Sequence, residues 1–488
     1  MVFSSAIFLF VFFPAVFAVY HIVPGMRAKN LVLVLASLVF YCFGRLTYLP
    51  LLLVSILVNW GLGRALGTAE GRGKRRALVA LLAVLDLGIM GVFKYLDFFV
   101  ENINALFGTA IPLPGIPLPL GISFFTFTAL SYGIEVYRKP ANVSKSLLDT
   151  ALYISLFPTI LSGPIVGWRT AAPQLRERTC TADKTARGIR RLTVGMAKKL
   201  LIADIVGKAV DGIYAGSVLD ARLAWLGAVG YAVQIYFDFA GYSDMAIGIG
   251  QVFGFAIPEN FDRPYRALGL TDFWKRWHIS LTGWFRNYLY MPLVMSGPLQ
   301  KLYKRWARKY GRAKANKLSI LIPMAVVWLL TGLWHGAAWN FVLWGLWHGL
   351  FCALEGVGII RTRGLEKSFG GRVVLRIYTW LVVLLGTVLF RSGSLAQAGG
   401  MYGAMFTGWD FTPAGTLLLQ QVLNGQNIFC LILGVLLGTV AVPKGLKAPE
   451  KLSRWGEPAS YVLCLGLLVL CVMNMAQSGF APFIYLQF

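Results

Sequence analysis

The sequence predicts an all-α membrane protein, a polytopic transmembrane helical bundle with re-entrant or broken helices around a central cavity. Hydrophobic residues make up 57% of the 488 residues and charged residues only 14%, and the mean hydropathy is +0.65. Many apolar runs are long enough to cross about 30 Å of hydrocarbon. Other apolar runs are interrupted by proline and glycine, and such backbone is tolerated at membrane depth only beside protein or a water-filled cavity.

The apolar runs predict one domain over residues 1–488 with about 11–12 spans. The first run, from Phe3 to Tyr20, has no basic segment before it. We therefore interpret it as a retained span and not as a cleaved signal peptide. The expected spans are 3–20, 31–43, 49–63, 77–96, 119–137, 191–213, 222–238, 318–334, 337–356, 373–391, 427–442 and 459–476.

The charge distribution predicts the orientation of the chain in the membrane. Lys and Arg number 46 against 21 acidic residues, a net charge of +25. The cations gather in short connections between apolar runs, such as 64–76, 301–317 and 443–454. The positive-inside rule places these connections in the cytoplasm, so both termini, including the tail near 478–488, are expected outside the cell membrane.

Composition also argues against several function classes. Because the positive charge follows the membrane topology and attracts anionic lipid, we do not expect nucleic acid as a partner. The six cysteines are scattered and form neither a disulfide framework nor a CxxC metal pattern. We therefore expect membrane lipid as a partner and no bound metal or cofactor.

One apolar segment, residues 147–167, is broken by Pro158, Gly163 and Pro164. A re-entrant element that lines a cavity and a kinked ordinary span both fit this pattern. Both interpretations stay open. Further on, the segment 272–293 mixes cations with Trp and Tyr, which predicts an interfacial or re-entrant helix pair.

The stretch 236–348 contains the candidate active site, because three of the four histidines, His278, His335 and His348, lie in it. Ionisable residues are costly inside a membrane, so each one there is a hypothesis of function, although any single histidine can also be a packing residue. Asp238 and Asp244 lie in the same stretch. For these carboxylates we favour a structural network with cations over catalysis.

His335 is the preferred catalytic residue. Gly332 and Gly336 are expected to leave room beside its imidazole, and Trp334 and Trp339 to form an apolar wall. Such a site suits a neutral histidine that accepts a proton. His348 follows after thirteen residues, about 220° around a continuous helix, so it is not expected on the same face and is treated as packing.

His278 is the second catalytic candidate. It follows Lys275 and Arg276, whose cations suit a phosphate or another anionic group of a donor substrate. Trp334 and Asn340, in the apolar block around His335, complete the set of donor-binding candidates. Without further context, the 275–278 block would also be explained as an anchor at the membrane interface.

Several long motifs are similar to those of bacterial membrane-bound O-acyltransferases, in the branch of the alginate O-acetylation proteins. The motifs are SYGIEVYR, LYISLFPTILSGPIVGW, FDFAGYSDMAIG, FWKRWHISL, LYMPL, GLWHGAAWNFVLWG and LFRSGSLAQA. The resemblance implies that His335 is the active-site histidine and His278 the second polar position of the same centre. It implies that the protein lies in the bacterial inner membrane and transfers an acetyl group from a cytoplasmic thioester, acetyl-CoA, toward an extracytoplasmic polysaccharide. It further implies an extracytoplasmic SGNH-type acetyltransferase as the partner protein.

Two positions depart from the family pattern, Glu135 in place of Asp and Asn287 in place of Asp. They put the identity of the polymer in doubt more than the chemistry. The carboxyl-terminal PFIYLQF contains Tyr485, which the resemblance implies as an acyl carrier. An aromatic membrane anchor is the alternative explanation of this segment.

Two other functions stay open from the sequence alone. One is transfer of D-alanyl or another acyl group from a carrier protein to a cell-wall polymer. The other is a membrane transporter whose broken helices bind substrate at the midplane, although no inverted repeat is visible in the sequence.

Overall fold

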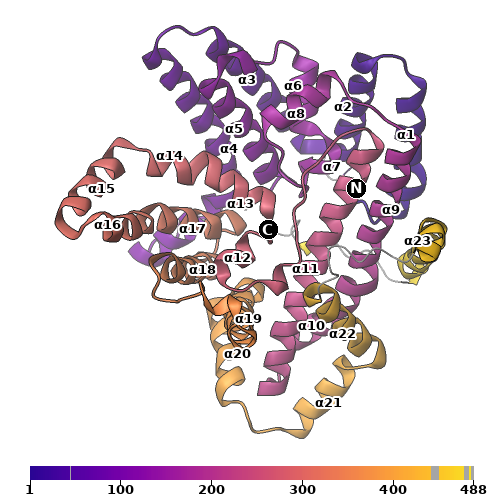
Figure 1. The fold of residues 1–488 in the computed structure, drawn as a ribbon, viewed down its shortest axis with the longest axis vertical. Coiled ribbons are helices and arrows are strands. Elements are labelled where there is room, and N and C mark those ends of the chain that lie inside the picture. The colour runs from indigo at the N-terminus through magenta and orange to yellow at the C-terminus, as the bar shows by residue number, and fades with distance from the viewer. Residues whose placement is uncertain (44–45, 441–449, 478–482, 485–488) are drawn as a thin grey trace. The chain divides into compact units, whose positions relative to one another are not determined.

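The computed structural model describes residues 1–43, 46–440, 450–477 and 483–484. Helices dominate these ranges, which contain no strand (Figure 1). The all-α fold class is therefore confirmed. The chain forms two compact units: the first comprises Met1–Met196, Gly241–Glu259 and Cys464–Gln487, and the second comprises Ala197–Ala240 and Asn260–Leu463. The tail near 478–488 lies outside the described residues except for Phe483 and Ile484.

In the first unit, α3, α4 and α5 pack against one another, and α2 packs against α6. The longest of its helices, α4, ends where Gly108 adopts a left-handed conformation that glycine tolerates without steric cost. The helical elements are η1 (Phe8–Phe12), α1 (Phe13–Ile22), α2 (Met26–Cys42), η2 (Leu46–Tyr48), α3 (Leu49–Thr68), α4 (Arg72–Phe107), α5 (Ile122–Arg138), η3 (Pro140–Asn142), α6 (Leu147–Ser155), α7 (Phe157–Ile160) and α8 (Trp168–Arg176). Three further helices contribute residues to both units: α9 (Ala182–Lys198), α11 (Ala221–Val252) and α23 (Glu450–Gln477).

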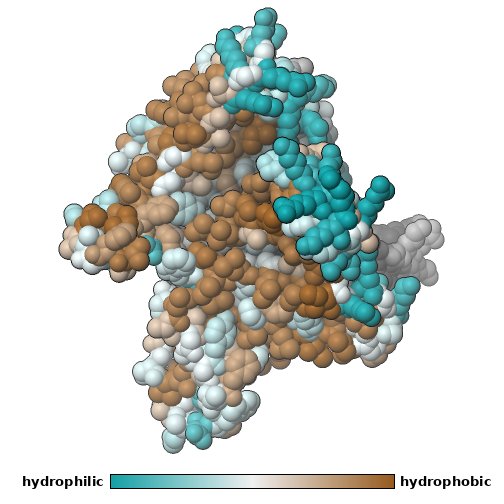
Figure 2. Space-filling model, turned by 90° about the vertical axis from the view of Figure 1, so that its left-hand side faces the viewer, coloured by the Kyte–Doolittle hydropathy of each residue, from teal (hydrophilic) through white to brown (hydrophobic). Residues whose placement is uncertain are grey.

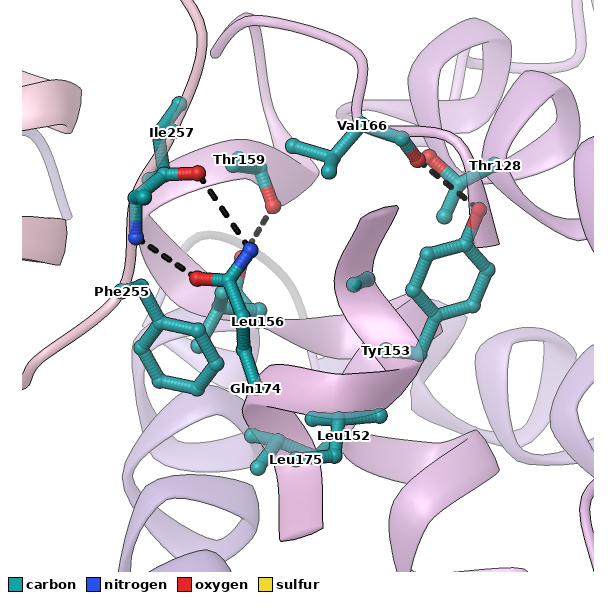
Figure 3. Close-up of a pocket in the computed structure, with 12 residues that line it drawn as sticks. Thr128, Leu152, Tyr153, Leu156, Thr159, Val166, Gln174, Leu175, Phe255 and Ile257 are labelled. Atoms are coloured by element: carbon teal, nitrogen blue, oxygen red, sulfur yellow. Dashed lines mark hydrogen bonds between the residues drawn. The ribbon is translucent and has the colours of Figure 1, made fainter. Parts of the chain in front are cut away.

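The break predicted in residues 147–167 is present. After α6 and the single turn of α7, the chain is not helical until α8 begins at Trp168. Val166 of this stretch, together with residues of α6, α7 and α8, lines a cavity of about 30 Å³ in the first unit (Figure 3). Tyr153 donates a hydrogen bond to the Val166 carbonyl, and the Gln174 amide accepts one from the backbone N–H of Ala256. A cavity of this size has room for water but not for an acyl donor.

In the second unit, α17 and α18 form a tightly packed helical hairpin, and α19 packs on α18. The elements are η4 (Lys199–Ala203), α10 (Asp204–Ala215), η5 (Pro264–Arg266), α12 (Leu270–Trp274), α13 (Ile279–Phe285), η6 (Arg286–Tyr290), α14 (Met291–Val294), α15 (Gly297–Tyr310), α16 (Arg312–Ser319), α17 (Leu321–His335), α18 (Trp339–Val357), η7 (Leu365–Lys367), α19 (Phe369–Arg391), α20 (Leu395–Thr407), α21 (Pro413–Val422) and α22 (Gly425–Thr439).

Helix length and composition identify the membrane-spanning candidates. Among the described residues, six helices are long and apolar enough to cross a membrane, and the pair α21 and α22, bent by 71°, is a seventh if it forms one broken span. The six are Leu46–Thr68, Arg72–Phe107, Ala221–Val252, Arg312–His335, Phe369–Arg391 and Gly456–Gln477. Apolar side chains are widely exposed on the face in Figure 2, while hydrophilic ones gather in clusters. These features are those of a multi-pass membrane protein.

The aromatic and basic segment from Leu270 to Val294 folds as short helices, α12 and α13 followed by η6 and α14. The segment is therefore helical as expected, and its interfacial or re-entrant placement stays a prediction. The basic segment 301–317 is also helical and belongs to α15 and α16. The two helices are separated by a turn at Gly311, which has a φ of 79°. In α15 the apolar residues Leu302, Tyr303 and Trp306 recur at helical spacing, which explains why this segment is a helix and not a loop.

Candidate active site

His335 is the last residue of α17, and the helix ends there because Gly336 is extended. The imidazole is buried, with 3% of the residue exposed. The ring centroids of Trp334 and Trp344 each lie 4.7 Å from that of His335, and the centroid of Phe390 lies 5.1 Å away. Three helices, α17, α18 and α19, therefore supply an aromatic enclosure for this histidine.

The enclosure differs in one way from the sequence-based expectation. Trp339 is 53% exposed, whereas Trp344, further along α18, is buried and packs against His335 together with the predicted Trp334. Gly332 lies directly against α18. A Cβ on Gly332 would lie 2.5 Å from the Phe341 carbonyl oxygen, so this glycine allows α17 and α18 to approach closely.

His278 precedes α13 and has a φ of 45° and a ψ of 53°. This left-handed conformation costs an L-residue about 1–2 kcal/mol, so the surrounding contacts must hold it. The residue is 1% exposed, and its Nδ1 lies 3.2 Å from Oδ1 of Asn260. Burial lowers the pKa of the His278 imidazole, which keeps the ring neutral.

Trp334 connects the two candidate catalytic histidines. Its ring centroid lies 6.0 Å from that of His278 and 4.7 Å from that of His335. On its other side, His278 meets the edge of Phe239 at 4.7 Å. The structure thus brings His278, Trp334 and His335 together in one buried aromatic cluster.

Glu355 on α18 anchors the turn that leads to His278. Its carboxylate accepts hydrogen bonds from the backbone N–H groups of Leu270 and Thr271 at 2.6 and 2.8 Å, and from the hydroxyl of Tyr378 at 3.1 Å. A carboxylate at these N–H groups satisfies the first turn of α12. Glu355 could not be singled out from the sequence, because an acid near the end of an apolar helix carries no distinguishing motif.

The two candidate donor-binding cations occupy different environments. The Arg276 guanidinium lies 3.0 Å from an Asp272 oxygen and 3.4 Å from an Asp262 oxygen. Lys275 is exposed. Arg276 therefore stabilises its own loop, and Lys275 is the cation that is accessible to an anionic ligand.

Asn340 is buried, and its amide donates hydrogen bonds to the carbonyls of Leu389 and Ser392 at 3.3 and 2.8 Å. These contacts tie the start of α18 to the end of α19. The residue thus positions the helices around His335.

His348 lies on α18, whereas His335 ends α17, so the two histidines are not on one continuous helix. The angular argument from the sequence therefore does not apply. Both histidines instead contact Trp344, at 4.7 and 4.9 Å between ring centroids. His348 also packs against Trp274 and Trp328.

The acidic residues of α11 pair with cations, as predicted. In the second unit, Asp238 lies 2.6 Å from the ammonium of Lys199. In the first unit, Asp244 lies 2.8 Å from the guanidinium of Arg191. The structural network expected for these carboxylates is therefore confirmed.

The remaining sequence candidates lie elsewhere. The Glu135 carboxylate accepts a hydrogen bond from the backbone N–H of Arg169 at 2.6 Å in the first unit. Asn287 lies in the π-helix η6 of the second unit. Tyr485 lies outside the described residues, although Phe483, two residues before it, is buried against Tyr242 at 4.7 Å in the first unit.

The long apolar helices define a multi-pass membrane protein, and its second unit contains a buried cluster of histidine and aromatic side chains. The family model for membrane-bound O-acyltransferases matches residues 120–396, which contain both histidines. The chain belongs to the membrane-bound O-acyltransferase family and is an O-acyltransferase.

The chain is also similar to individual members of this family and to related acyltransferases. A probable alginate O-acetylase of Pseudomonas syringae pv. tomato is 39% identical over the full length of both chains. A peptidoglycan O-acetyltransferase of Helicobacter pylori is 32% identical over 82% of this chain and 78% of its own. A teichoic acid D-alanyltransferase of Bacillus subtilis is 30% identical over 46% of this chain and 55% of its own.

Proposed function

We propose that this protein transfers an acetyl group from cytoplasmic acetyl-CoA across the bacterial inner membrane for O-acetylation of an extracytoplasmic polysaccharide. The observation that carries the proposal is the buried cluster of His278, Trp334 and His335, found in a chain similar over its full length to a probable alginate O-acetylase. We further propose an extracytoplasmic SGNH-type acetyltransferase as the protein that receives the acetyl group.

His335 acts as the general base in this proposal. A neutral imidazole removes the proton of a hydroxyl, the hydroxyl oxygen attacks the thioester carbonyl, and the carbon–sulfur bond breaks as the coenzyme leaves as a thiol. The surrounding rings of Trp334, Trp344 and Phe390 exclude water and so oppose hydrolysis of the thioester. His278, which shares Trp334 with His335, provides a second neutral imidazole in the same reaction centre.

Lys275 and Arg276 have separate roles in donor use. Exposed Lys275 attracts the phosphates of the coenzyme. Arg276, already paired with Asp272 and Asp262, holds the loop that carries His278.

The test uses purified protein in lipid vesicles with acetyl-CoA outside, and measures thiol release together with acetyl transfer to a polysaccharide-acetylating partner. His335→Ala should abolish both signals, and His278→Ala should reduce them by about 100-fold or more, the contribution typical of general acid–base groups. Unchanged thermal unfolding of the variants is the control for folding. Near-normal acetylation by folded His335→Ala protein would refute the assignment of the base.

Transfer of a D-alanyl group from a carrier protein is the second candidate. It is favoured by the 30% identity to a teichoic acid D-alanyltransferase over 46% of this chain. Supplying the vesicles with acetyl-CoA and with a D-alanyl carrier protein in separate experiments distinguishes the two donors.

A further inference from the structure

Asn260 has no place in the proposed chemistry, yet it is 1% exposed and contacts a candidate catalytic residue directly. It is located ten residues before α12, in the second unit. Its backbone carbonyl accepts a hydrogen bond from the N–H of Ile279 at 2.9 Å. Its side-chain Oδ1 accepts hydrogen bonds from the N–H and the hydroxyl of Ser280, at 3.2 and 2.9 Å.

These contacts replace the missing N-cap of α13. The first N–H groups of a helix need acceptors from outside the helix, and the N-cap side chain usually provides one. Here the N-cap residue is His278, whose side chain makes no such bond. Asn260 supplies the acceptors instead, so the imidazole is not used to cap the helix.

The same contacts fix the orientation of the Asn260 amide. A backbone N–H can only donate, so the side-chain atom that meets the Ser280 N–H is the oxygen and not the nitrogen. This oxygen also lies 3.2 Å from Nδ1 of His278. Because an amide oxygen can only accept, Nδ1 must carry the proton.

We propose that Asn260 is a positioning residue that holds His278 as the Nδ1–H tautomer, so that the lone pair on Nε2 is the group presented to the reaction. A neutral imidazole has a single N–H, and the hydrogen bond made by one nitrogen decides which nitrogen is basic. This inference rests on the proposed function for the use of the lone pair, but the tautomer itself can be measured without any activity.

The first experiment is solid-state NMR of protein labelled with ¹⁵N-histidine and reconstituted in lipid. The chain has four histidines, and the His278 signals are assigned by their loss in His278→Gln. In the wild type, Nδ1 of His278 should show the shift of a protonated nitrogen and Nε2 that of an unprotonated one. The reverse pattern in the wild type would overturn the proposal.

Variants of Asn260 test the cause. Asn260→Leu removes the acceptor at similar volume and should give a mixture of tautomers at His278, with kcat lowered at least 10-fold and KM for acetyl-CoA unchanged. Asn260→Asp keeps an acceptor and should retain the Nδ1–H tautomer. Ser280→Ala is the matched control, because it removes one hydrogen bond to Oδ1 and leaves the contact with His278.

Asn260→Asp also gives a readout that a purely structural role would not change. A carboxylate beside Nδ1 stabilises the imidazolium and raises the pKa of His278, so the neutral form is lost at a higher pH than in the wild type. The acidic limb of the kcat–pH profile should therefore move to higher pH, whereas Ser280→Ala should leave it in place. If Asn260→Leu does not fold, the role of Asn260 is still tested by the His278 tautomer in the wild type and by the acidic limb of the kcat–pH profile of Asn260→Asp.

The outcomes separate this inference from the proposed function. Full activity in His278→Gln would remove His278 from the reaction, while the NMR pattern would still decide whether Asn260 sets its tautomer. An unchanged tautomer in folded Asn260→Leu, or an unmoved acidic limb in Asn260→Asp, would overturn the role of Asn260 even if both histidines are essential.

Discussion

The ammonium of Lys199 lies 2.6 Å from a carboxylate oxygen of Asp238, and both side chains are 2% exposed. A second carboxylate, that of Asp204, lies 2.7 Å from the same ammonium and is 14% exposed. One buried cation thus compensates two acids that come from α10 and α11. Removal of the cation leaves two carboxylates together, whereas removal of Asp238 leaves the Lys199–Asp204 pair.

This asymmetry predicts different costs for the two substitutions. Lys199→Met should destabilise the protein by about 3–5 kcal/mol, the range for breaking a buried ion pair, and Asp238→Asn should cost less. The double variant should recover part of the loss, because the remaining acid is then single. Thermal unfolding in detergent measures all three, and equal losses in the two single variants would contradict this account of the cluster.

The close contact between α17 and α18 depends on Gly345. A Cβ there would lie 2.9 Å from the Gly332 Cα, and backbone atoms cannot move aside as a flexible side chain can. Gly345→Ala should therefore cost about 1–3 kcal/mol, as overpacking typically does. It should also lower activity, because α17 carries His335. Gly370→Ala on α19, where a Cβ meets nothing within 4 Å, is the matched control.

The sequence predicted the helical class, the break after α6 and the pairing of Asp238, because each follows from local composition and the cost of burial. It did not identify Lys199 as the partner, since the partner lies 39 residues away and many cations are available. Trp344 was missed for a related reason. Its role depends on where α17 ends and α18 begins and on the close approach of the two helices at Gly332 and Phe341, which no sequence period indicates.

Asn260 was missed because an Asn in a connection that contains prolines is typical of a turn. Its function becomes visible only when the fold brings it against His278 and Ser280. What distinguishes Asn260 is that it is buried and lies against a second buried polar residue. Neither the burial of a loop residue nor such a contact can be predicted from the local sequence pattern.

The two adjacent cations, Lys275 and Arg276, should respond differently to substitution. Lys275→Ala should raise KM for acetyl-CoA about 3–10-fold with little change in kcat, since exposed Lys275 contributes binding only. Arg276→Ala should lower kcat and thermal stability, because it loses its contacts with Asp272 and Asp262. Steady-state kinetics at two salt concentrations measure both, and only the Lys275 effect should weaken with salt.

The basic helices α15 and α16 should face the cytoplasm. Eight cations lie in residues 301–317, and the positive-inside rule places such segments on the cytoplasmic side. Gly311 is exposed, and a Cβ added there would meet no atom within 4 Å. Gly311→Cys should therefore resist an impermeant thiol reagent added to intact cells and react after permeabilisation. Labelling in intact cells would reverse the proposed orientation and place the acetyl-CoA entrance on the wrong side.

Tyr485 is predicted to carry the acyl group transiently, on the basis of the sequence. A phenol with a pKa of about 10 is a weak nucleophile at neutral pH unless a base removes its proton, and this would give the neutral imidazole of His335 a defined task. An aryl ester also has a better leaving group than an alkyl ester, which suits onward transfer to an extracytoplasmic partner.

Tyr485→Phe removes the hydroxyl and keeps the aromatic ring, so it separates an acyl carrier from a membrane anchor. We expect polysaccharide acetylation to be lost in this variant, and intact-mass analysis with excess acetyl-CoA to show one acetyl ester in the wild type only. Tyr461→Phe is the control for loss of a tyrosine hydroxyl elsewhere in the chain. Wild-type acetylation by Tyr485→Phe, together with no ester at Tyr485, would leave this segment as an anchor.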